Sequence, residues 1–435
     1  MVVTKRVARA ILDRILQGEE PRERLTLLEP RVPTREEPLP PHPPCATEHT
    51  AESVERRRAF FRERGVALDQ LAGEGPEMDP EELEGNIEGL VGFARVPVGV
   101  VGPLRVNGSE AHGDFYVPMA TTEGALVASY QRGAEVISRS GGATVLCITE
   151  AVSRAPCFVF DNMREAAEFL AYAIPRYDSL QAAVVETSSH CMLDDVRTVL
   201  FGKEVFLVFE YKTGDAAGQN MVTMATDAAC RRLLEESPVR PRRWYVEGNL
   251  SGDKKATMLS FVYARGRKVI AEATIPRRVV QRFLHVDPEE IAHYWKTSVL
   301  GGVQSGSIGV QGHFANALAA VFIACGQDVA CVSEAAIGMN HMEATDEGDL
   351  YAFVTLPNLI VGTVGGGTHL PTARECLEMM ECQGTGKARK FAEICCAAAL
   401  AGEISIAAAM AAGQFTDAHA TYGRKGNRPE HEDDD

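Results

Sequence analysis

Positive charge is the scarcer charge in this 435-residue sequence, in which 44 lysine and arginine residues stand against 60 aspartate and glutamate residues. Nucleic acids and anionic membrane surfaces are bound by clustered positive charge, so neither is expected as a general partner. An anionic ligand would instead need a local pocket of cations. The positions of lysine and arginine are therefore the first place to look for a binding site.

Paired cysteines and long apolar runs are missing as well. The eleven cysteines form no CxxC pair, no zinc-type spacing and no disulfide-like rhythm, so we predict reduced, buried thiols and no metal site. No uninterrupted apolar run approaches the 18 or so residues that span a bilayer, and there is no signal-peptide core. These absences predict a cytoplasmic protein without membrane contact.

The glycine fingerprint GxGxxG after a strand is absent, which leaves a Rossmann domain without support, and there is no internal repeat. The length exceeds what one hydrophobic core usually supports, so we expect about two or three domains. Residues 29–44 carry too much proline for helix or sheet and indicate an extended linker. Met1 to Ile15 is basic and weakly amphipathic, and we predict a short docking helix there.

The pattern changes between about residues 156 and 245, where short apolar strands alternate with helices. We interpret this stretch as an inserted α+β domain. The predicted strands are 157–160, 182–186 and 204–211, and the predicted helices are 163–173 and a second one from about 215.

Beyond residue 286 small residues recur at helical spacing, which predicts closely packed, buried helices at 305–325 and 386–412. The predicted domains are an N-terminal helical region with the linker (1–91), a large domain (92–155 and 246–413), a small domain (156–245) and a C-terminal segment with an acidic tail (414–435).

Two adjacent lysines, Lys254 and Lys255, follow a Gly248-Asn249 turn and Asp253, and neighbouring cations in a turn indicate an anion site. Taken alone, solvated surface lysines explain them. Glu123 lies at a predicted helix start, where a capping role suffices, and Asp328 on its own passes for a turn residue.

Taken together, these residues resemble a known family. The lysine pair, Pro118-Met119-Ala120-Thr121-Thr122-Glu123-Gly124 and Ala324-Cys325-Gly326-Gln327-Asp328 resemble hydroxymethylglutaryl-CoA (HMG-CoA) reductase in its class I form, over roughly residues 50 to 425. The resemblance implies an α+β fold, with a large helical and mixed domain around a long central helix and an inserted ferredoxin-like small domain that binds a nicotinamide dinucleotide. It also implies the soluble catalytic portion, without the membrane anchor of eukaryotic members.

The implied activity is the four-electron reduction of (S)-HMG-CoA by two NADPH to (R)-mevalonate and CoA, a step of the mevalonate pathway and of isoprenoid biosynthesis. NADPH is the implied cofactor, and coenzyme A is part of the substrate. The family's active site is built across a dimer interface, so the resemblance also implies a homodimer or homotetramer.

Four residues match the family's catalytic positions. Glu123 matches the catalytic acid, and Lys254 matches the ammonium that stabilises the carbonyl oxygen. Asp328 matches the aspartate between these two groups. His419, in Asp417-Ala418-His419-Ala420-Thr421, matches the histidine that protonates the departing CoA thiolate.

Substrate recognition falls on Lys255 and Arg154, since an arginine fork grips a carboxylate with two parallel hydrogen bonds. The other substrate-binding residues implied by the resemblance are Asn249, Asp253, Lys296, His313 and Asn316.

The dinucleotide site is expected at two segments, Gly214 to Met221 and the glycine loop Gly362 to Thr368, whose main chain can approach a ligand closely. Arg424 offers a cation for the 2′-phosphate that distinguishes NADPH from NADH. The cofactor-binding residues so implied are Asp215, Gly218, Gln219, Asn220, Gly365, Gly366, Gly367 and Arg424.

Three residues depart from the family pattern: Glu247 adds a negative charge near the expected carboxylate site, and Gln311 and Cys331 replace asparagine and glutamine. Two alternatives therefore stay open. One is a reductase of the same fold acting on a different acyl-CoA thioester. The other is a non-catalytic protein that binds CoA or a dinucleotide.

Overall fold

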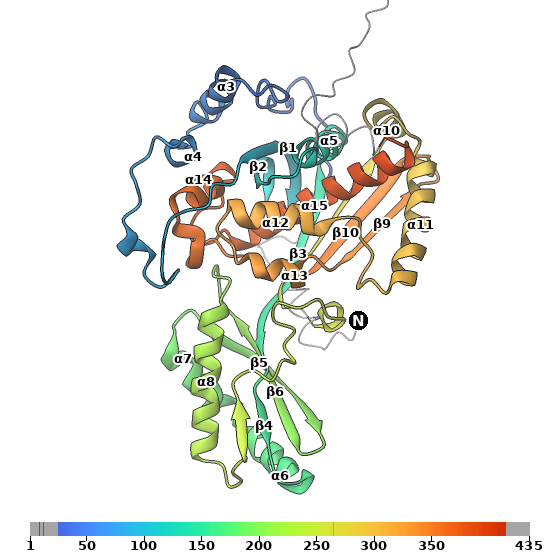
Figure 1. Cartoon of the computed structure of the whole chain (residues 1–435). Helices are drawn as coiled ribbons and strands as arrows, with labels where there is room; N and C mark the ends of the chain where they lie inside the picture. Colours follow the sequence, from blue (N-terminus) through green and yellow to red (C-terminus); the bar gives the residue numbers. More distant parts are fainter. Residues whose placement is uncertain (1–7, 9–11, 13–24, 264, 415–435) are drawn as a thin grey trace, which may run out of the picture.

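The computed structural model describes residues 8, 12, 25–263 and 265–414. Figure 1 shows an upper body, which contains most of the helices and the larger part of the sheet, and a smaller lower body beneath it. The predicted docking helix at Met1 to Ile15, together with His419, Arg424 and the acidic tail, lies outside the described residues.

The upper body is built on a mostly antiparallel sheet. Its strand order is β2-β1-β3-β8-β10-β9, and only the β1–β3 pair is parallel. The strands are β1 (Val98–Gly108), β2 (His112–Ala120), β3 (Ala143–Arg154), β8 (Gly266–Ile275), β9 (Met339–Ala344) and β10 (Leu350–Leu359).

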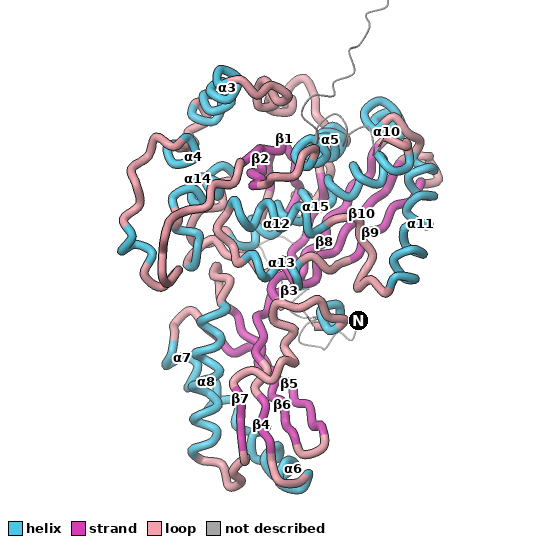
Figure 2. Tube along the Cα trace, viewed as in Figure 1, coloured by secondary structure: helices cyan, strands magenta, loops and turns pink. Residues whose placement is uncertain are grey.

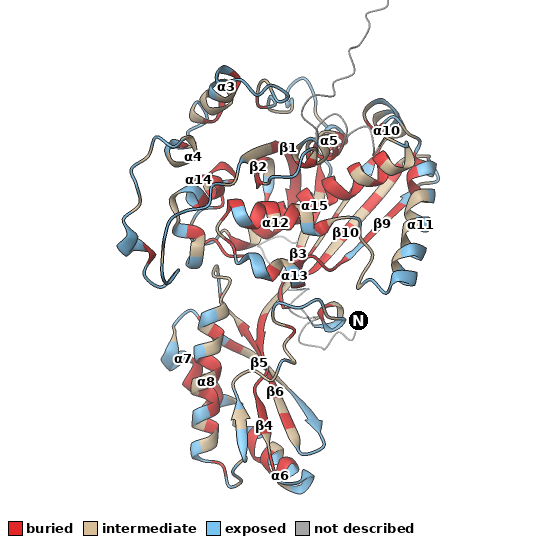
Figure 3. Cartoon of the chain, viewed as in Figure 1, coloured by how far each residue is buried: buried red, intermediate tan, exposed pale blue. Residues whose placement is uncertain are grey.

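Helix α15 (Ala388–Ala411) runs through the middle of this body, as the small-residue pattern predicts. Its side chains are almost all buried, and Figure 3 shows it as the red helix lying across the sheet. Helix α5 (Leu126–Arg139) packs closely against it: a Cβ placed on Gly133 would lie 1.8 Å from the main-chain oxygen of Ala401. Only glycine allows the two helices to approach this closely.

Helix α15 also corrects the expectation about apolar segments. Among the described residues it is the one helix long and apolar enough, by length and composition alone, to cross a membrane. However, 83% of its most apolar stretch is buried inside the protein. The core position of α15 explains its composition, because a helix that is apolar on all sides needs cover on all sides.

The lower body has its own hydrophobic core, formed by residues between Val152 and Leu233. In Figure 2 its helices flank a small sheet, in which β6 is hydrogen-bonded to β3, β4 and β5, and β7 to β4. Its elements are β4 (Cys157–Val159), α6 (Met163–Ala173), η2 (Ile174–Arg176), α7 (Tyr177–Thr187), β5 (Met192–Phe201), β6 (Glu204–Lys212), α8 (Gln219–Glu235) and β7 (Arg243–Tyr245). The predicted α+β class, with an inserted small body, is confirmed.

Two predicted elements are wrong. The segment 182–186 is not a strand but part of α7, whose buried residues Leu180, Ala183 and Val184 follow helical spacing. The predicted helix 305–325 is interrupted, because α11 (Pro288–Ser305) ends at the left-handed Gly306 and α12 (Phe314–Ala324) begins only after a glycine-containing loop.

The N-terminal region contributes α3 (Ala51–Arg62), capped by the side chain of Thr50, which accepts from the main-chain N–H of Ser53. Phe60 and Phe61 of this helix pack on Tyr116 of β2 and attach the region to the upper body. The remaining elements are α4 (Asp69–Ala72), η1 (Pro80–Leu83), α9 (Leu259–Val262), α10 (Arg277–Leu284), η3 (Val329–Cys331), α13 (Val332–Ala335), η4 (Gly366–His369) and α14 (Pro371–Met379).

Candidate active site

The loop between β7 and α9 carries Lys254 in a left-handed backbone conformation, with φ of 55°. Its main-chain N–H donates to Oε1 of Glu334 at 3.1 Å, and Glu334 is completely buried on α13. A non-glycine residue with positive φ is strained unless its surroundings hold it. The buried carboxylate therefore fixes the backbone from which the lysine side chain extends.

The ammonium of Lys254 lies 2.8 Å from Oδ2 of Asp328, with side-chain exposures of 44% and 38%. Hydrogen bonding to this carboxylate raises the pKa of Lys254, and partial burial opposes the shift. Lys254 is therefore a fixed cation at neutral pH that solvent and a ligand can still reach. This pair confirms the proximity of Lys254 and Asp328 that the sequence led us to expect.

The turn that carries Asp328 is held by the glycine loop. Gln327 forms two hydrogen bonds with the main chain of Gly362, at 2.8 and 2.9 Å. Gly326 and Gly367 pack so closely that a Cβ on Gly326 would lie 2.2 Å from the main-chain oxygen of Gly367. Gly367, one of the glycines predicted for the cofactor, thus lies directly against the aspartate turn.

Glu123 does not cap a helix, the role that it would have had if taken alone. Helix α5 begins at Leu126, after a left-handed Ala125, and Glu123 lies exposed before it. Its Oε1 accepts a hydrogen bond from Nδ2 of Asn316 at 3.3 Å, which brings together a predicted acid and a predicted substrate-binding residue. Within the part of the chain that the structure describes, no polar contact joins Glu123 to Lys254 or Asp328.

His313 is positioned by the central helix. Buried Glu403 of α15 accepts from the main-chain N–H groups of Gly312 and His313, at 2.6 and 2.7 Å, and its Oε1 lies 3.2 Å from Nδ1 of His313. The imidazole stacks on the ring of Tyr130, with centroids 5.3 Å apart. Both the loop before α12 and the orientation of the imidazole are therefore fixed from the core.

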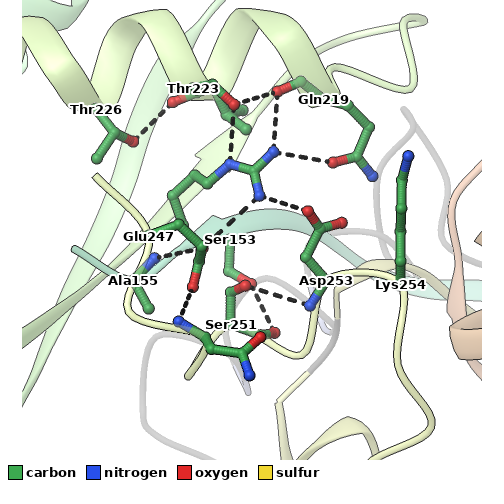
Figure 4. Close-up of polar contacts among 12 residues, drawn as sticks. Ser153, Ala155, Gln219, Thr223, Thr226, Glu247, Ser251, Asp253 and Lys254 are labelled. Carbon is green, nitrogen blue, oxygen red and sulfur yellow. Dashed lines mark hydrogen bonds and ion pairs between the residues drawn. The ribbon is translucent and has the colours of Figure 1, made fainter. Parts of the chain in front are cut away.

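Arg154, at the end of β3, is buried, and its partners Thr223 and Gln219 on α8 and Asp253 in the lysine loop are labelled in Figure 4. Nη1 donates to Oδ2 of Asp253 at 2.6 Å, and Nε donates to Oγ1 of Thr223 at 3.0 Å. Nη2 lies within hydrogen-bonding distance of both oxygens of Gln219, at 3.3 and 3.4 Å. Arg154 therefore connects two other predicted site residues, Asp253 and Gln219.

Sequence reasoning missed Arg265 and Glu334. Arg265 donates through Nη2 to Oδ1 of Asp253 at 2.6 Å and to Oε1 of Gln219 at 2.8 Å, and through Nη1 to both oxygens of Glu334. Burial raises the pKa of Asp253, but the neighbouring Arg265 and Arg154 outweigh it and lower that pKa overall. The run Arg265-Gly266-Arg267 at the start of an apolar strand could have indicated them. Arginines in such a strand are expected to be buried, and buried cations require anionic partners.

Glu247, the added carboxylate, lies beside Arg154. Its Oε2 accepts from the main-chain N–H of Ala155 at 3.2 Å and lies 3.7 Å from Nη1 of Arg154. Its Oε1 accepts from the main-chain N–H of Asn249 at 2.6 Å. The main-chain N–H of Gly248 donates to the main-chain oxygen of Ala155 at 2.7 Å. The chain therefore enters the lower body at Ala155 and leaves it at Gly248, side by side.

The start of α8 fits a phosphate-bearing dinucleotide. Its N-cap is Gly218, which has φ of 78° and no side chain to satisfy the first N–H groups, and its first turn holds no acidic residue. A Cβ on Gly218 would lie 2.4 Å from the side chain of Thr213, so only glycine is accommodated. A helix start of this kind favours an anion.

The other predicted residues have different surroundings. Asp215 accepts from the main-chain N–H groups of Gly386 and Ala388, at 2.7 and 3.1 Å, and so caps α15. Lys255 is exposed, and its ammonium donates to the main-chain oxygen of Asp253 at 2.8 Å. Lys296 is exposed on α11, and Asn220 is exposed on α8.

The fold and the site define a two-body α+β enzyme in which a fixed ammonium, carboxylates and a buried guanidinium meet near a helix start capped by glycine. A family model described as hydroxymethylglutaryl-coenzyme A reductase matches residues 53–424. The chain therefore belongs to the HMG-CoA reductase family, as its motifs predicted.

Named relatives agree with this placement. The chain is 42% identical over 378 residues to 3-hydroxy-3-methylglutaryl-coenzyme A reductase of Pyrococcus abyssi, covering 85% of this chain and 92% of the relative. It is 43% identical over 378 residues to that of Pyrococcus horikoshii, covering 85% and 91%. The enzyme of Nicotiana sylvestris is 35% identical over 381 residues, covering 85% of this chain and 62% of the plant protein.

Among solved structures, the fold is similar to that of a class II 3-hydroxy-3-methylglutaryl-CoA reductase from Streptococcus pneumoniae bound to NADPH in open conformations. The TM-score is 0.66, with 83% of this chain and 97% of the other covered. At 19% identity this likeness shows the fold alone. The class I assignment stays a prediction.

Proposed function

We propose that this protein reduces HMG-CoA with two NADPH and two protons to mevalonate, CoA and two NADP+. The observation that carries the proposal is the Lys254–Asp328 pair at 2.8 Å, within a chain that belongs to the HMG-CoA reductase family. A thioester carbonyl that accepts hydride develops negative charge on oxygen, and a fixed ammonium stabilises that charge.

NADPH, when bound, supplies the hydride for each of the two reductions. We infer that the start of α8, at Gly218 and Gln219, and the glycine loop Gly365–Gly367 hold it. Asp215 supports this region indirectly, because its carboxylate attaches the turn before α8 to the start of α15. Arg424 is proposed to bind the 2′-phosphate of NADPH, and Asn220 is proposed to contact NADPH from the first turn of α8.

The chain's own residues have separate roles in this proposal. Lys254 holds positive charge beside the carbonyl oxygen, and Asp328 keeps that ammonium in place. Glu123 delivers a proton to the oxygen, with Asn316 orienting its carboxylate. His419 protonates the CoA thiolate as it leaves.

Substrate binding is proposed for the groups around Arg154. Its guanidinium and Lys255 receive the carboxylate of the acyl chain, Asp253 and Asn249 shape the loop, and His313 and Lys296 contact the remainder of the substrate. We further propose a homodimer or homotetramer, a cytoplasmic location and the domain boundaries given above for the sequence.

The test follows absorbance of the reduced nicotinamide with purified protein, HMG-CoA and either NADPH or NADH, and counts cofactor oxidised per CoA released. Two NADPH per CoA are expected. The variant Lys254→Ala should lose at least about a hundredfold in kcat, as for loss of one oxyanion-stabilising group. The matched control is Lys203→Ala, which removes an exposed lysine of the lower body and should leave kcat unchanged.

A folded wild-type protein that oxidises neither cofactor with HMG-CoA would contradict the proposal. The ion pair between Glu247 and Arg154 favours one second candidate, a reductase of another acyl-CoA, because a negative charge already lies at the carboxylate site. Turnover with a thioester that lacks a carboxylate, and none with HMG-CoA, would support that candidate instead.

A further inference from the structure

The guanidinium of Arg154 has five N–H donors, and four hydrogen bonds within this chain leave one donor that faces only Glu247. One donor at Nε serves Thr223, and the two at Nη2 serve Gln219. The two donors at Nη1 face Asp253 at 2.6 Å and Glu247 at 3.7 Å. A carboxylate from a ligand that binds at this fifth donor would take the place that Glu247 occupies.

The oxygen Oε2 of Glu247 lies between two donors, the N–H of Ala155 at 3.2 Å and Nη1 of Arg154 at 3.7 Å. Figure 4 shows the Glu247 carboxylate beside the main chain of Ala155. A main-chain N–H and a guanidinium that face one oxygen form a small anion hole. A carboxylate from a ligand would find the same two donors there.

Glu247 is the partner most easily replaced. Asp253 also accepts from the buried Arg265 at 2.6 Å, so its removal would leave one donor on each of two guanidinium groups without its closest acceptor. Glu247 has one longer ion pair, is 24% exposed, and keeps the N–H of Asn249 on its other oxygen. The two side chains are similarly exposed, at 20% and 24%, so the difference lies in the pairing: a carboxylate held at 2.6 Å by two guanidinium groups is harder to displace than one held by a single pair at 3.7 Å.

The charges of the cluster lead to the same conclusion. Arg154 and Arg265 are two cations, whereas Asp253, Glu247 and Glu334 are three carboxylates. Lys254 is paired with Asp328, and the ammonium of the exposed Lys255 donates to the main-chain oxygen of Asp253 rather than to one of the three carboxylates. A further carboxylate would raise the negative excess unless one of the three moves away.

We propose that Glu247 is a specificity-determining residue whose carboxylate competes with the carboxylate of the substrate for the anion hole of Arg154 and Ala155. It lowers the affinity for thioesters with an acidic acyl chain and leaves the affinity for neutral acyl chains unaffected. The inference rests on the proposed function for the identity of the substrate. The competition itself requires only that the ligand carries a carboxylate, whatever reaction follows.

The test measures equilibrium binding of free 3-hydroxy-3-methylglutarate and of glutarate by calorimetry to the wild type, Glu247→Gln and Glu247→Ser. Both variants should bind the two acids about tenfold more tightly, the size expected for one charged partner. With HMG-CoA the KM should fall by a similar factor, while the KM for NADPH stays the same. Inhibition by butyryl-CoA, whose acyl chain is neutral, should not change.

The matched control is Glu235→Gln, which removes one negative charge from an exposed position of α8 and should leave every one of these constants unchanged. Unchanged acid binding in both Glu247 variants, or a gain equal to that of the control, would overturn the proposal. So would failure of the wild type and of both variants to bind either acid. An absence of HMG-CoA turnover would overturn the proposed function, whereas tighter acid binding in the same variants would still support the competition.

Discussion

Arg265 and Glu334 form a doubly hydrogen-bonded ion pair in the protein interior, at 2.8 and 2.9 Å, with side-chain exposures of 2% and 0%. The pair connects the start of β8 to α13, and Glu334 also accepts from the main chain of Lys254. Burial raises the pKa of Glu334, and the attraction of Arg265 opposes that rise. The active-site loop therefore depends on an ion pair formed between segments far apart in the sequence.

Replacing Arg265 with methionine should be strongly destabilising. The change leaves the carboxylate of Glu334 buried without its cation, which typically costs about 3–5 kcal/mol of the free energy of unfolding. Urea unfolding measures it, with Arg231→Met as the control because Arg231 forms an exposed ion pair on α8. The control should have the same free energy of unfolding as the wild type. If Arg265→Met also had the wild-type value, the buried ion pair would contribute little to stability.

The pH dependence of catalysis should report the Lys254–Asp328 pair. Since the carboxylate raises the pKa of Lys254, Asp328→Asn should lower it, and the ammonium should be lost at lower pH. The alkaline limb of the kcat profile should then move to lower pH in the variant. Asp346→Asn, at an exposed turn, should leave the limb where it is. An unmoved limb in Asp328→Asn would mean that another group controls it.

Glu393 makes the stability of the central helix depend on pH. Burial raises its pKa from 4.5 to about 7, against hydrogen bonds from the main chain of Ala111 and Glu110 and from other donors. A carboxyl whose folded pKa exceeds its unfolded pKa contributes stability that is complete below the unfolded value and is lost as the pH rises through the folded value.

The difference in unfolding free energy between wild type and Glu393→Gln should therefore fall by about 3 kcal/mol as the pH rises from about 4.5 to about 7. Chemical unfolding at several pH values measures this difference, with Glu347→Gln as an exposed control. A difference that stays constant with pH would refute the titration of Glu393 in this range.

Two glycine-to-alanine substitutions should have opposite effects. At Gly133 the added Cβ would lie 1.8 Å from the oxygen of Ala401, so α5 and α15 must separate, at a cost of at least about 1–3 kcal/mol. At Gly301, within α11, the added Cβ meets nothing within 4 Å, and stability should rise by about 0.4–1 kcal/mol. Thermal unfolding of both variants and of the wild type measures these changes. A Gly133→Ala protein as stable as the wild type would contradict the close packing of α5 and α15.

Local sequence patterns were sufficient to predict those helices whose ends are determined by capping residues next to them in the sequence. The helix Met163–Ala173 was predicted to the residue, because Asn162 caps it and its apolar residues recur at helical spacing. The segment 182–186 was wrong because a short apolar run fits a strand as well as a helix. Its neighbours in the fold, rather than its own composition, make it helical.

The candidate site was predicted in part, for a related reason. Lys254, Asp328 and Arg154 stand in recognisable motifs, and the structure brings each of them into contact with other predicted site residues or with one another. The Arg265–Glu334 pair could not be predicted, because the two residues lie 69 positions apart and neither belongs to a motif. Buried ion pairs of this kind are defined by tertiary contacts alone.

The hydrogen bond between Gly248 and Ala155 closes the point where the chain enters and leaves the lower body. Because Arg154 and Glu247 flank this closure, the anion hole is built at the joint itself rather than within either body. The width of the hole therefore depends on the contacts that hold the two crossings of the chain together, with Ala155 on one crossing and Glu247 on the other.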